Sequence, residues 1–491
     1  MNKKVIVIGA GFAGLSSAAC LAKDGYDVTI LEKNESVGGR ARQFKAAGFT
    51  FDMGPSWYWM PDVFENFYNK FGYTTSDLYD LQRLDPAYKV HFGENDHVDI
   101  PANFDELVDL FESIEQGSGQ NLKKFLDQAE YKYQVGINDL VYKPSKSLTE
   151  FFDWRIVSGV FKMDLFKSIS SEIRKLFKNP KLIELLEFPV LFLGAKPQNT
   201  PALYSLMNYA DLKLGTWYPK GGMHKIVEAM EKIAREQGVK IETGVEIDRF
   251  EYNNGTITSA ISGSDRYDAD AFVGAGDYHH IEQKLVDKKY RNYSEDYWDK
   301  RTMAPSSLLF YIGVDKKLKN LNHHNLFFDE DFTVHAQEIY DDPKWPSKPL
   351  FYVCAPSITD ETVAPKGKEN LFILIPTAPD LEDTEEMRER YYKIVMDRLE
   401  KLTKQKIDES VVYKKSYAHK DFKNDYHAFK GNAYGLANTL KQTAILKPSM
   451  HSKKLKNLLF TGQLTVPGPG VPPSLISGQV VAKEVAKSLK Q

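Results

Sequence analysis

The 491-residue chain has only two cysteines, Cys20 and Cys354, which lie far apart. They cannot form a disulfide framework, so we expect a reducing cytoplasm as the compartment. The net charge of −3 gives no general reason to expect a nucleic-acid partner. Since no stretch approaches 18 consecutive apolar residues, we also expect no segment that spans a membrane.

The sequence also lacks the spacings of common catalytic machinery. We find no catalytic triad and no nucleophile elbow, and we assign a catalytic role to no side chain. The pairs His279-His280 and His323-His324 make poor joint ligands, because neighbouring residues of a strand point to opposite faces, and we expect no metal. Asp52 suits either a base beside a cofactor or, as we favour, a carboxylate that forms a turn.

The N-terminal segment has the pattern of a dinucleotide-binding unit. An apolar strand at residues 5–8 leads into Gly9, Gly11 and Gly14, and a helix is expected over about residues 13–24. Gly9 permits a tight turn, Gly11 lets the backbone approach a pyrophosphate, and Gly14 lets the helix pack on the sheet. We prefer this interpretation to a glycine-rich turn without a ligand, because strand, glycines and helix occur in the required order.

The next residues continue the pattern. A second strand over residues 27–31 ends at Glu32, whose carboxylate is placed to accept hydrogen bonds from both ribose hydroxyls and repels a 2′-phosphate. Gly38-Gly39-Arg40 suits a loop along a diphosphate with the guanidinium as its charged partner, although an ordinary surface ion pair is the alternative. Gly54-Pro55-Ser56 adds another turn that permits close approach.

A proline- and glycine-rich run near the C-terminus, residues 467–473, separates an apolar strand at residues 457–461 from a helical pattern. Such a run is typical of a disordered tail or a stiff polyproline turn. Here we expect it to present backbone without bulky side chains to a flat ring. Ser474 is the expected N-cap of the helix, whose positive end would stabilise negative charge on the ring.

Three motifs carry a family resemblance: E-K-N-x-x-x-G-G-R at residues 32–40, F-D-M-G-P-S at 51–56, and the G-Q-L-T-V-P-G-P-G-V-P-P-S tail at 462–474. They resemble the FAD-containing amine oxidase superfamily and, more narrowly, the bacterial-type phytoene (carotenoid) desaturases. The resemblance implies an α/β fold, in which a Rossmann-like FAD-binding domain built from three segments carries an inserted α+β substrate domain with a helical membrane-facing part.

The resemblance implies the following domain boundaries. The FAD-binding domain comprises residues 1–85, 215–290 and 415–491, and the substrate-binding domain comprises residues 86–214 and 291–414, with a helical insert around 105–200. Val245 would contact the adenine through its backbone, although an ordinary scaffold role is equally compatible with its motif. The residues expected to bind FAD are Gly9, Gly11, Phe12, Ala13, Gly14, Glu32, Gly39, Arg40, Pro55, Ser56, Val245, Gly462, Val471 and Pro472.

The expected reaction is dehydrogenation of phytoene or a related acyclic carotenoid by hydride transfer to flavin N5, with a quinone or oxygen as the electron acceptor. Three alternatives remain: a desaturase of a later, hydroxylated or monocyclic carotenoid, a flavin amine or protoporphyrinogen oxidase, and a non-enzymatic prenyl-binding escort protein. Carotenoids reside in the bilayer, so the resemblance also implies peripheral attachment to the membrane.

One segment offers a candidate membrane contact. On a helix over residues 164–178, apolar residues share one side and Lys167, Arg174, Lys175 and Lys178 share the other. A basic amphipathic helix suits a membrane interface. A core helix with one solvated face is the alternative, and it is the commoner arrangement.

Overall fold

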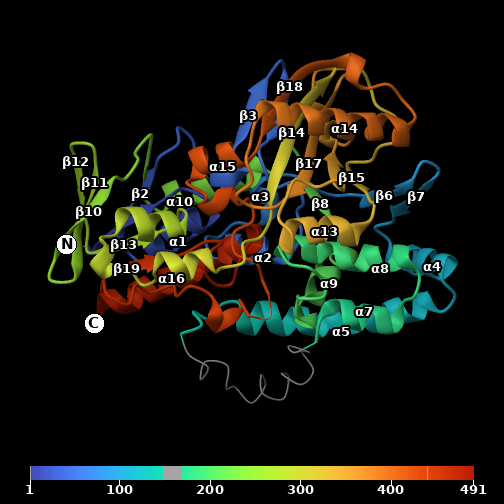
Figure 1. Cartoon of the computed structure of the whole chain (residues 1–491). Coiled ribbons are helices and arrows are strands. Elements are labelled where there is room, and N and C mark those ends of the chain that lie inside the picture. The colour runs from blue at the N-terminus through green and yellow to red at the C-terminus, as the bar shows by residue number, and fades with distance from the viewer. Residues whose placement is uncertain (1, 147–166, 440, 491) are drawn as a thin grey trace.

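The computed structural model describes residues 2–146, 167–439 and 441–490. Figure 1 shows a mixed α/β architecture, in which a parallel five-stranded sheet and a larger seven-stranded sheet lie side by side. Both termini lie near the smaller sheet in this view. A layer of helices adjoins the larger sheet at the opposite end of the molecule.

The five-stranded sheet draws its strands from distant parts of the chain. All neighbouring pairs are parallel, and such strands are apolar along their length because both faces are covered. The strand β1, with the sequence KVIVI, is buried after its first residue. The order across the sheet is β19 (Leu458–Phe460), β13 (Ala271–Gly274), β1 (Lys4–Ile8), β2 (Asp27–Glu32) and β9 (Lys240–Thr243).

Three helices pack around this sheet: α1 (Phe12–Lys23), α10 (His224–Glu236) and α16 (Val471–Lys490). The helix α1 contacts both of the others. A Cβ atom at Gly478 of α16 would lie 2.0 Å from Ser16 Oγ of α1. These two helices, which are far apart in the sequence, therefore cross in close contact.

A hairpin sheet extends from the edge of this region. It contains β10 (Arg249–Asn253), β11 (Thr256–Ser262) and β12 (Asp265–Asp268). The turn predicted at residues 253–255 is present, with positive φ angles of 48° at Asn254 and 75° at Gly255. Positive φ at both central residues is the geometry that two-residue hairpin turns favour.

The seven-stranded sheet is mostly antiparallel. Its inner strands β14 and β17 have nine residues each, and every residue of β14 is buried. The helix α14 (Glu385–Thr403) covers one face and buries Tyr391, Val395 and Leu399 in a shared cluster with Phe310. The order is β18 (Val411–Tyr417), β14 (Ser306–Val314), β17 (Glu369–Thr377), β16 (Phe351–Cys354), β15 (His324–Phe327), β6 (Tyr88–Gly93) and β7 (Asp96–Ile100).

The helical layer and several short elements complete the described chain. The layer contains α4 (Phe104–Ile114), α5 (Ser118–Val135), α7 (Ile169–Leu176), α8 (Pro180–Glu187) and α9 (Leu206–Leu212). The short elements used below are β3 (Gln43–Ala46), β4 (Phe49–Asp52), α2 (Pro61–Asn69), α11 (Tyr278–His280), α13 (Phe332–Tyr340) and α15 (His419–Tyr426). Within the described ranges, no helix combines the length and apolar character needed to cross a bilayer.

The predicted amphipathic helix over residues 164–178 is shorter than expected. Residues 164–166 lie outside the described ranges, and α7 begins only after Ser168, whose side chain accepts a hydrogen bond from the Ser171 amide. The backbone becomes extended at Phe177. Lys167 and Lys178 therefore lie outside the helix, because its N-cap and its C-terminal turn confine it to eight residues.

Candidate cofactor and substrate site

A cavity of about 440 Å³ lies where β1, β2, β13 and β19 end. The carboxyl ends of parallel strands are the usual ligand position in open α/β sheets. Gly14 does not line the cavity, whereas the other predicted cofactor residues all do. These lining residues are Gly9, Gly11, Phe12, Ala13, Glu32, Gly39, Arg40, Pro55, Ser56, Val245, Gly462, Val471 and Pro472.

The three N-terminal glycines have different roles. Gly9 has a φ of +106°, and a Cβ there would lie 3.0 Å from the Gly276 nitrogen. A Cβ at Gly14 would lie 1.9 Å from the Gly9 carbonyl oxygen, so Gly14 permits the contact between α1 and the end of β1. A Cβ at Gly11 would meet nothing within 4 Å. Gly11 therefore borders open space at the N-terminus of α1, which is where a pyrophosphate binds in this type of fold.

Glu32 is held in a fixed orientation at the end of β2. Its carboxylate accepts hydrogen bonds from the Ala10 amide at 2.7 Å, the Asn34 amide at 2.9 Å and the Asn34 side-chain amide at 2.8 Å. The side chain is buried at the cavity wall. A carboxylate oriented by backbone donors at this point is suited to accept hydrogen bonds from ribose hydroxyls.

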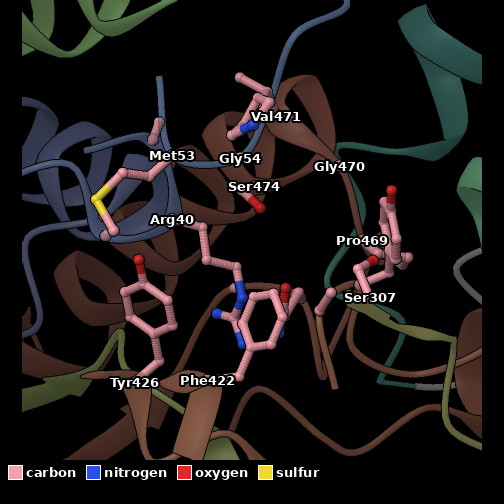
Figure 2. A pocket seen from close by; sticks show the side chains of 18 of the residues that line it. Arg40, Met53, Gly54, Ser307, Phe422, Tyr426, Pro469, Gly470, Val471 and Ser474 are labelled. Atoms are coloured by element: carbon pink, nitrogen blue, oxygen red, sulfur yellow. The ribbon is translucent and has the colours of Figure 1, made fainter. Parts of the chain in front are cut away.

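Arg40 extends across the cavity toward the C-terminal part of the chain. Its guanidinium donates a hydrogen bond to the Asn432 carbonyl at 3.3 Å and lies 5.0 Å from the ring centroid of Tyr426. Figure 2 shows its side chain extending toward Phe422 and Tyr426. The buried Nε atom has no hydrogen-bond partner among the described residues. An enclosed guanidinium with an unused donor fits the diphosphate of a dinucleotide.

Asp277 is a cavity residue that the sequence analysis missed. It follows β13 and the Gly274–Gly276 turn, and its carboxylate accepts hydrogen bonds from the amides of His280 and Phe429. Burial raises the pKa of this carboxyl to about 6, while its amide donors and the charge of Arg40 act in the opposite direction. The sequence did contain a signal for this residue. Asp277 closely follows an apolar strand that ends in glycines, and the ends of parallel strands are the usual ligand position.

The C-terminal segment presents the N-terminus of α16 to the cavity. Gly470, Val471 and Ser474 all line it, and Figure 2 shows them on the same side of the pocket. The prediction that Ser474 caps this helix is wrong, because the helix already begins at Val471 and the Ser474 amide donates to the Gly470 carbonyl at 3.0 Å. The following Pro472 and Pro473 are accepted because first-turn residues need no N–H partner.

Val245 lines the cavity close to Glu32, but its amide is already used. The Val245 N–H donates to the Glu32 carbonyl at 2.8 Å. This hydrogen bond orders the chain after β9 beside the end of β2. The predicted backbone contact to an adenine therefore has to be made by an atom other than this amide hydrogen.

Asp52 has a structural role, but it is not the turn-forming role that we favoured. Its carboxylate accepts hydrogen bonds from the Met223 amide at 2.6 Å and the His224 amide at 3.2 Å. These donors belong to the N-terminus of α10, where a negative charge is stabilising. Burial raises the pKa of the Asp52 carboxyl, and the residue lies outside the main cavity.

The far part of the cavity is apolar, and the residues that line it were not predicted. Its walls combine residues from the turn before α2, the helix α13 and the inner strands of the seven-stranded sheet. Such lining suits a hydrocarbon ligand, since few polar groups have to be desolvated. Its apolar residues include Trp57, Trp59, Met60, Phe188, Met207, Leu326, Phe328, Phe332, Ala336, Ile339, Leu350, Phe372 and Leu374.

Contrary to our expectation, the neighbouring histidines His323 and His324 can direct ligand atoms to one point. Ligand atoms of His323, His324 and Cys354 all lie within 4.8 Å of one another, and all three residues are buried. The alternation rule does not apply, because His323 precedes β15 while His324 begins it. However, each Nδ1 already has a partner, Thr359 Oγ1 at 3.0 Å for His323 and Tyr352 Oη at 2.6 Å for His324.

The site combines three features: a parallel sheet with glycine turns, the carboxylate of Glu32 after β2, and the N-terminus of α16 at the cavity. Together they define a dinucleotide-binding oxidoreductase fold. Residues 12–486 match the family described as flavin containing amine oxidoreductase. The chain therefore belongs to that family, and it is an FAD-dependent oxidoreductase.

Individual relatives sharpen this assignment. A carotenoid 3,4-desaturase from Haloarcula japonica is 40% identical over 490 residues, which cover 99% of both chains. A zeta-carotene-forming phytoene desaturase from Myxococcus xanthus is 30% identical and covers 99% of this chain and 94% of the relative. Within its family, the chain thus belongs with the carotenoid desaturases.

Solved structures show the same fold at low sequence identity. An oxidoreductase from Methanosarcina mazei has a TM-score of 0.63 and 16% identity, covering 98% of this chain and 100% of the other. Cyclohexylamine oxidase from Brevibacterium oxydans has a TM-score of 0.60 and 14% identity, with full coverage of both chains. These similarities show that the described part of the chain shares this fold.

Proposed function

We propose that the protein is an FAD-dependent desaturase that introduces carbon–carbon double bonds into an acyclic carotenoid. The observation that carries this proposal is full-length 40% identity with a carotenoid 3,4-desaturase. The cavity supports it, because charged and glycine-rich walls continue into walls of apolar side chains. The amine oxidase and escort-protein alternatives are not favoured by these relatives.

The predicted cofactor residues would hold FAD in an extended position across the ends of the parallel strands. Glu32 would bind the ribose, Arg40 the diphosphate, and the N-terminus of α16 would face the flavin. Bound FAD supplies a hydride acceptor, with a quinone or oxygen as the proposed acceptor of its electrons. We propose that residues 1–85, 215–290 and 415–491 form the FAD domain and that 86–214 and 291–414 form the substrate domain.

The contribution of the chain to this reaction is orientation and exclusion of water. The apolar walls would hold an extended polyene in one position, so that a saturated carbon–carbon bond lies at the reacting end. Removal of a hydride next to a double bond gives a cation stabilised by conjugation. The chain then has to provide a proton acceptor in an otherwise dry environment.

One observation favours a later carotenoid over phytoene within this function. The buried Tyr340 hydroxyl lines the cavity, and it has no hydrogen-bond partner among the described residues. A hydrocarbon leaves such a group unpaired, whereas a hydroxylated carotenoid can pair with it.

A pigment assay tests the proposal. The enzyme is expressed in cells that accumulate phytoene and separately in cells that accumulate hydroxylated acyclic carotenoids, and the pigments are separated by chromatography. We expect new double bonds in at least one background, and faster conversion of the hydroxylated substrates. Conversion of amines with no conversion of any carotenoid would overturn the assignment.

We also propose peripheral attachment to the membrane through the basic residues Lys167, Lys175 and Lys178 in and around α7. Their side chains lie at the surface of the helical layer, where Lys167 and Lys175 both pair with Glu172. Arg174 is less suited, because it pairs with the buried Glu187 at 3.3 Å. The lipid solubility of a carotenoid gives the reason for such attachment.

A further inference from the structure

A connected set of polar side chains interrupts the apolar wall of the cavity. The Tyr352 hydroxyl, on β16, donates a hydrogen bond to Ser56 Oγ at 3.0 Å. Its oxygen also lies 2.6 Å from His324 Nδ1, and the tautomer of His324 sets which of these two atoms donates. Tyr352 and Ser56 both line the cavity, while His324 lies behind them. Ser56 belongs to the Gly54–Ser56 turn, where we expect the cofactor to bind.

The His324 ring is completely enclosed. It is 0% exposed, and it stacks on Trp57 with ring centroids 4.1 Å apart and an interplanar angle of 10°. Burial lowers the pKa of His324 well below its usual value, and the adjacent His323 adds to this effect. The imidazole is therefore neutral, and its second nitrogen, Nε2, has no hydrogen-bond partner within the described ranges.

We propose that Tyr352 and His324 form the proton acceptor of the desaturation reaction. This inference rests on the proposed function. After the substrate has given up a hydride, the neighbouring carbon loses a proton to Tyr352 Oη. For this step the Tyr352 hydroxyl turns from Ser56 Oγ to His324 Nδ1, and its own proton moves to that nitrogen. The electron pair of the broken C–H bond becomes the second bond of the new double bond. Charge is conserved, because the cation disappears as the imidazolium forms.

The chemistry requires only a weak base at this position. A conjugated carbocation is a very strong acid, so a neutral imidazole with a lowered pKa still accepts its proton. The arrangement also keeps the acceptor neutral until it is needed, because a permanent charge in an apolar wall would be costly. General bases placed in this way typically contribute factors of about 10²–10⁴ to the rate.

We call the transfer of the proton through Tyr352 to His324 the relay, and two substitutions test it by measuring activity. His324→Asn keeps a hydrogen-bonding atom near the Nδ1 position but cannot take a proton, and Tyr352→Phe removes the hydroxyl. We expect each to lower kcat by about 100-fold, with KM and FAD content near the wild-type values. The double variant should be no slower than the worse single variant, because the two residues act as one unit.

The matched control is His323→Asn. His323 is the sequence neighbour of His324 and is also buried, but its Nδ1 pairs with Thr359 rather than Tyr352. We expect this variant to keep at least about half of the wild-type kcat. Equal losses in the His323 and His324 variants would mean that the pair is only structural, and would overturn the relay.

A measurement on the unmodified protein does not depend on turnover. Nitrogen-15 NMR of histidine-labelled enzyme, with the His324 signals identified by their loss in His324→Asn, reports which ring nitrogen carries the proton. The relay requires an unprotonated Nδ1 that accepts a hydrogen bond, and its shift should change in Tyr352→Phe. A proton on Nδ1 would overturn the proposal, and so would stoichiometric zinc or copper in the purified enzyme, since a ligated His324 cannot accept a proton.

The two proposals fail in distinguishable ways. If the wild-type enzyme converts no carotenoid, the proposed function is overturned, and the relay is overturned with it. If the wild-type enzyme converts carotenoids and the His324 and Tyr352 variants do so at undiminished rates, only the relay is overturned. If either variant fails to fold, the NMR measurement on the wild-type enzyme still decides the protonation state that the relay requires.

Discussion

The two ends of the cavity are built in different ways. The end beside β1 and β2 is made by backbone, glycines and a few charged groups, such as Glu32 and Arg40. The end beside α13 and the seven-stranded sheet is made by large apolar side chains, such as Phe332 and Leu374. A cofactor that is shared by a whole family can be bound by short local motifs, whereas the shape of an apolar wall depends on how distant elements pack.

The largest effect should come from the glycines of the cofactor end. Gly14→Ala places a methyl group where only 1.9 Å separates it from the Gly9 carbonyl oxygen, so we expect a loss of stability of at least about 4 kcal/mol. Gly11→Ala meets no atom within 4 Å and should fold with nearly unchanged Tm, yet bind FAD at least about 10-fold more weakly. Thermal unfolding and flavin absorbance distinguish the two, and equal Tm values would contradict the assigned roles.

Arg40→Gln should have the next largest effect. It removes a charged donor that we expect to contact the diphosphate, so the Kd for FAD should rise by about 10–100-fold. Titration of the apoprotein with FAD measures this change. The control is Arg266→Gln, which removes a guanidinium that pairs with Asp268 on the exposed hairpin sheet. If both variants bind FAD like the wild type, Arg40 does not contact the cofactor.

The apolar end should respond to changes that leave the cofactor end unaffected. Ala336 of α13 is buried and lines the cavity, so Ala336→Phe should narrow it and lower kcat/KM by about 10-fold through steric overpacking. FAD content should stay unchanged. Val334, on the same helix, is 39% exposed, and Val334→Phe is the matched control. Loss of FAD in Ala336→Phe would show that the two ends are not independent.

We expect the smallest effect from the surface lysines in and around α7, and it should be a change in liposome binding. Reversing Lys167, Lys175 and Lys178 to glutamate should weaken co-sedimentation with anionic liposomes, since each basic residue near such a surface contributes about 1 kcal/mol. Activity in detergent should not change. The control variant reverses Lys240, Lys300 and Lys414, which are lysines in other parts of the chain. Equal binding by the test variant and the wild type would remove this surface from the proposed membrane contact.

Much of the cofactor end could be predicted from the sequence, because its signals are local. The strand–glycine–helix unit spans about 20 residues, and Glu32 and Arg40 follow within the next few. Ser474 was misplaced as a cap because prolines also suit the first turn of a helix, so the boundary at Val471 was ambiguous. Val245 was found by its motif, but its amide partner on Glu32 depends on two strands meeting in the sheet.

The sequence by itself determined the class of cofactor, the strand–helix–strand order of the N-terminal segment and the close contacts at Gly9 and Gly14. These follow from steric limits and from backbone hydrogen bonding over short distances along the chain. Only the tertiary structure decided the apolar wall, the place of Asp277 beside Arg40 and the contact between Tyr352 and His324. The residues that meet in these features are separated by tens to hundreds of positions in the chain. Burial sets their pKa values and polarity, and it exists only once the sheets and helices have packed together.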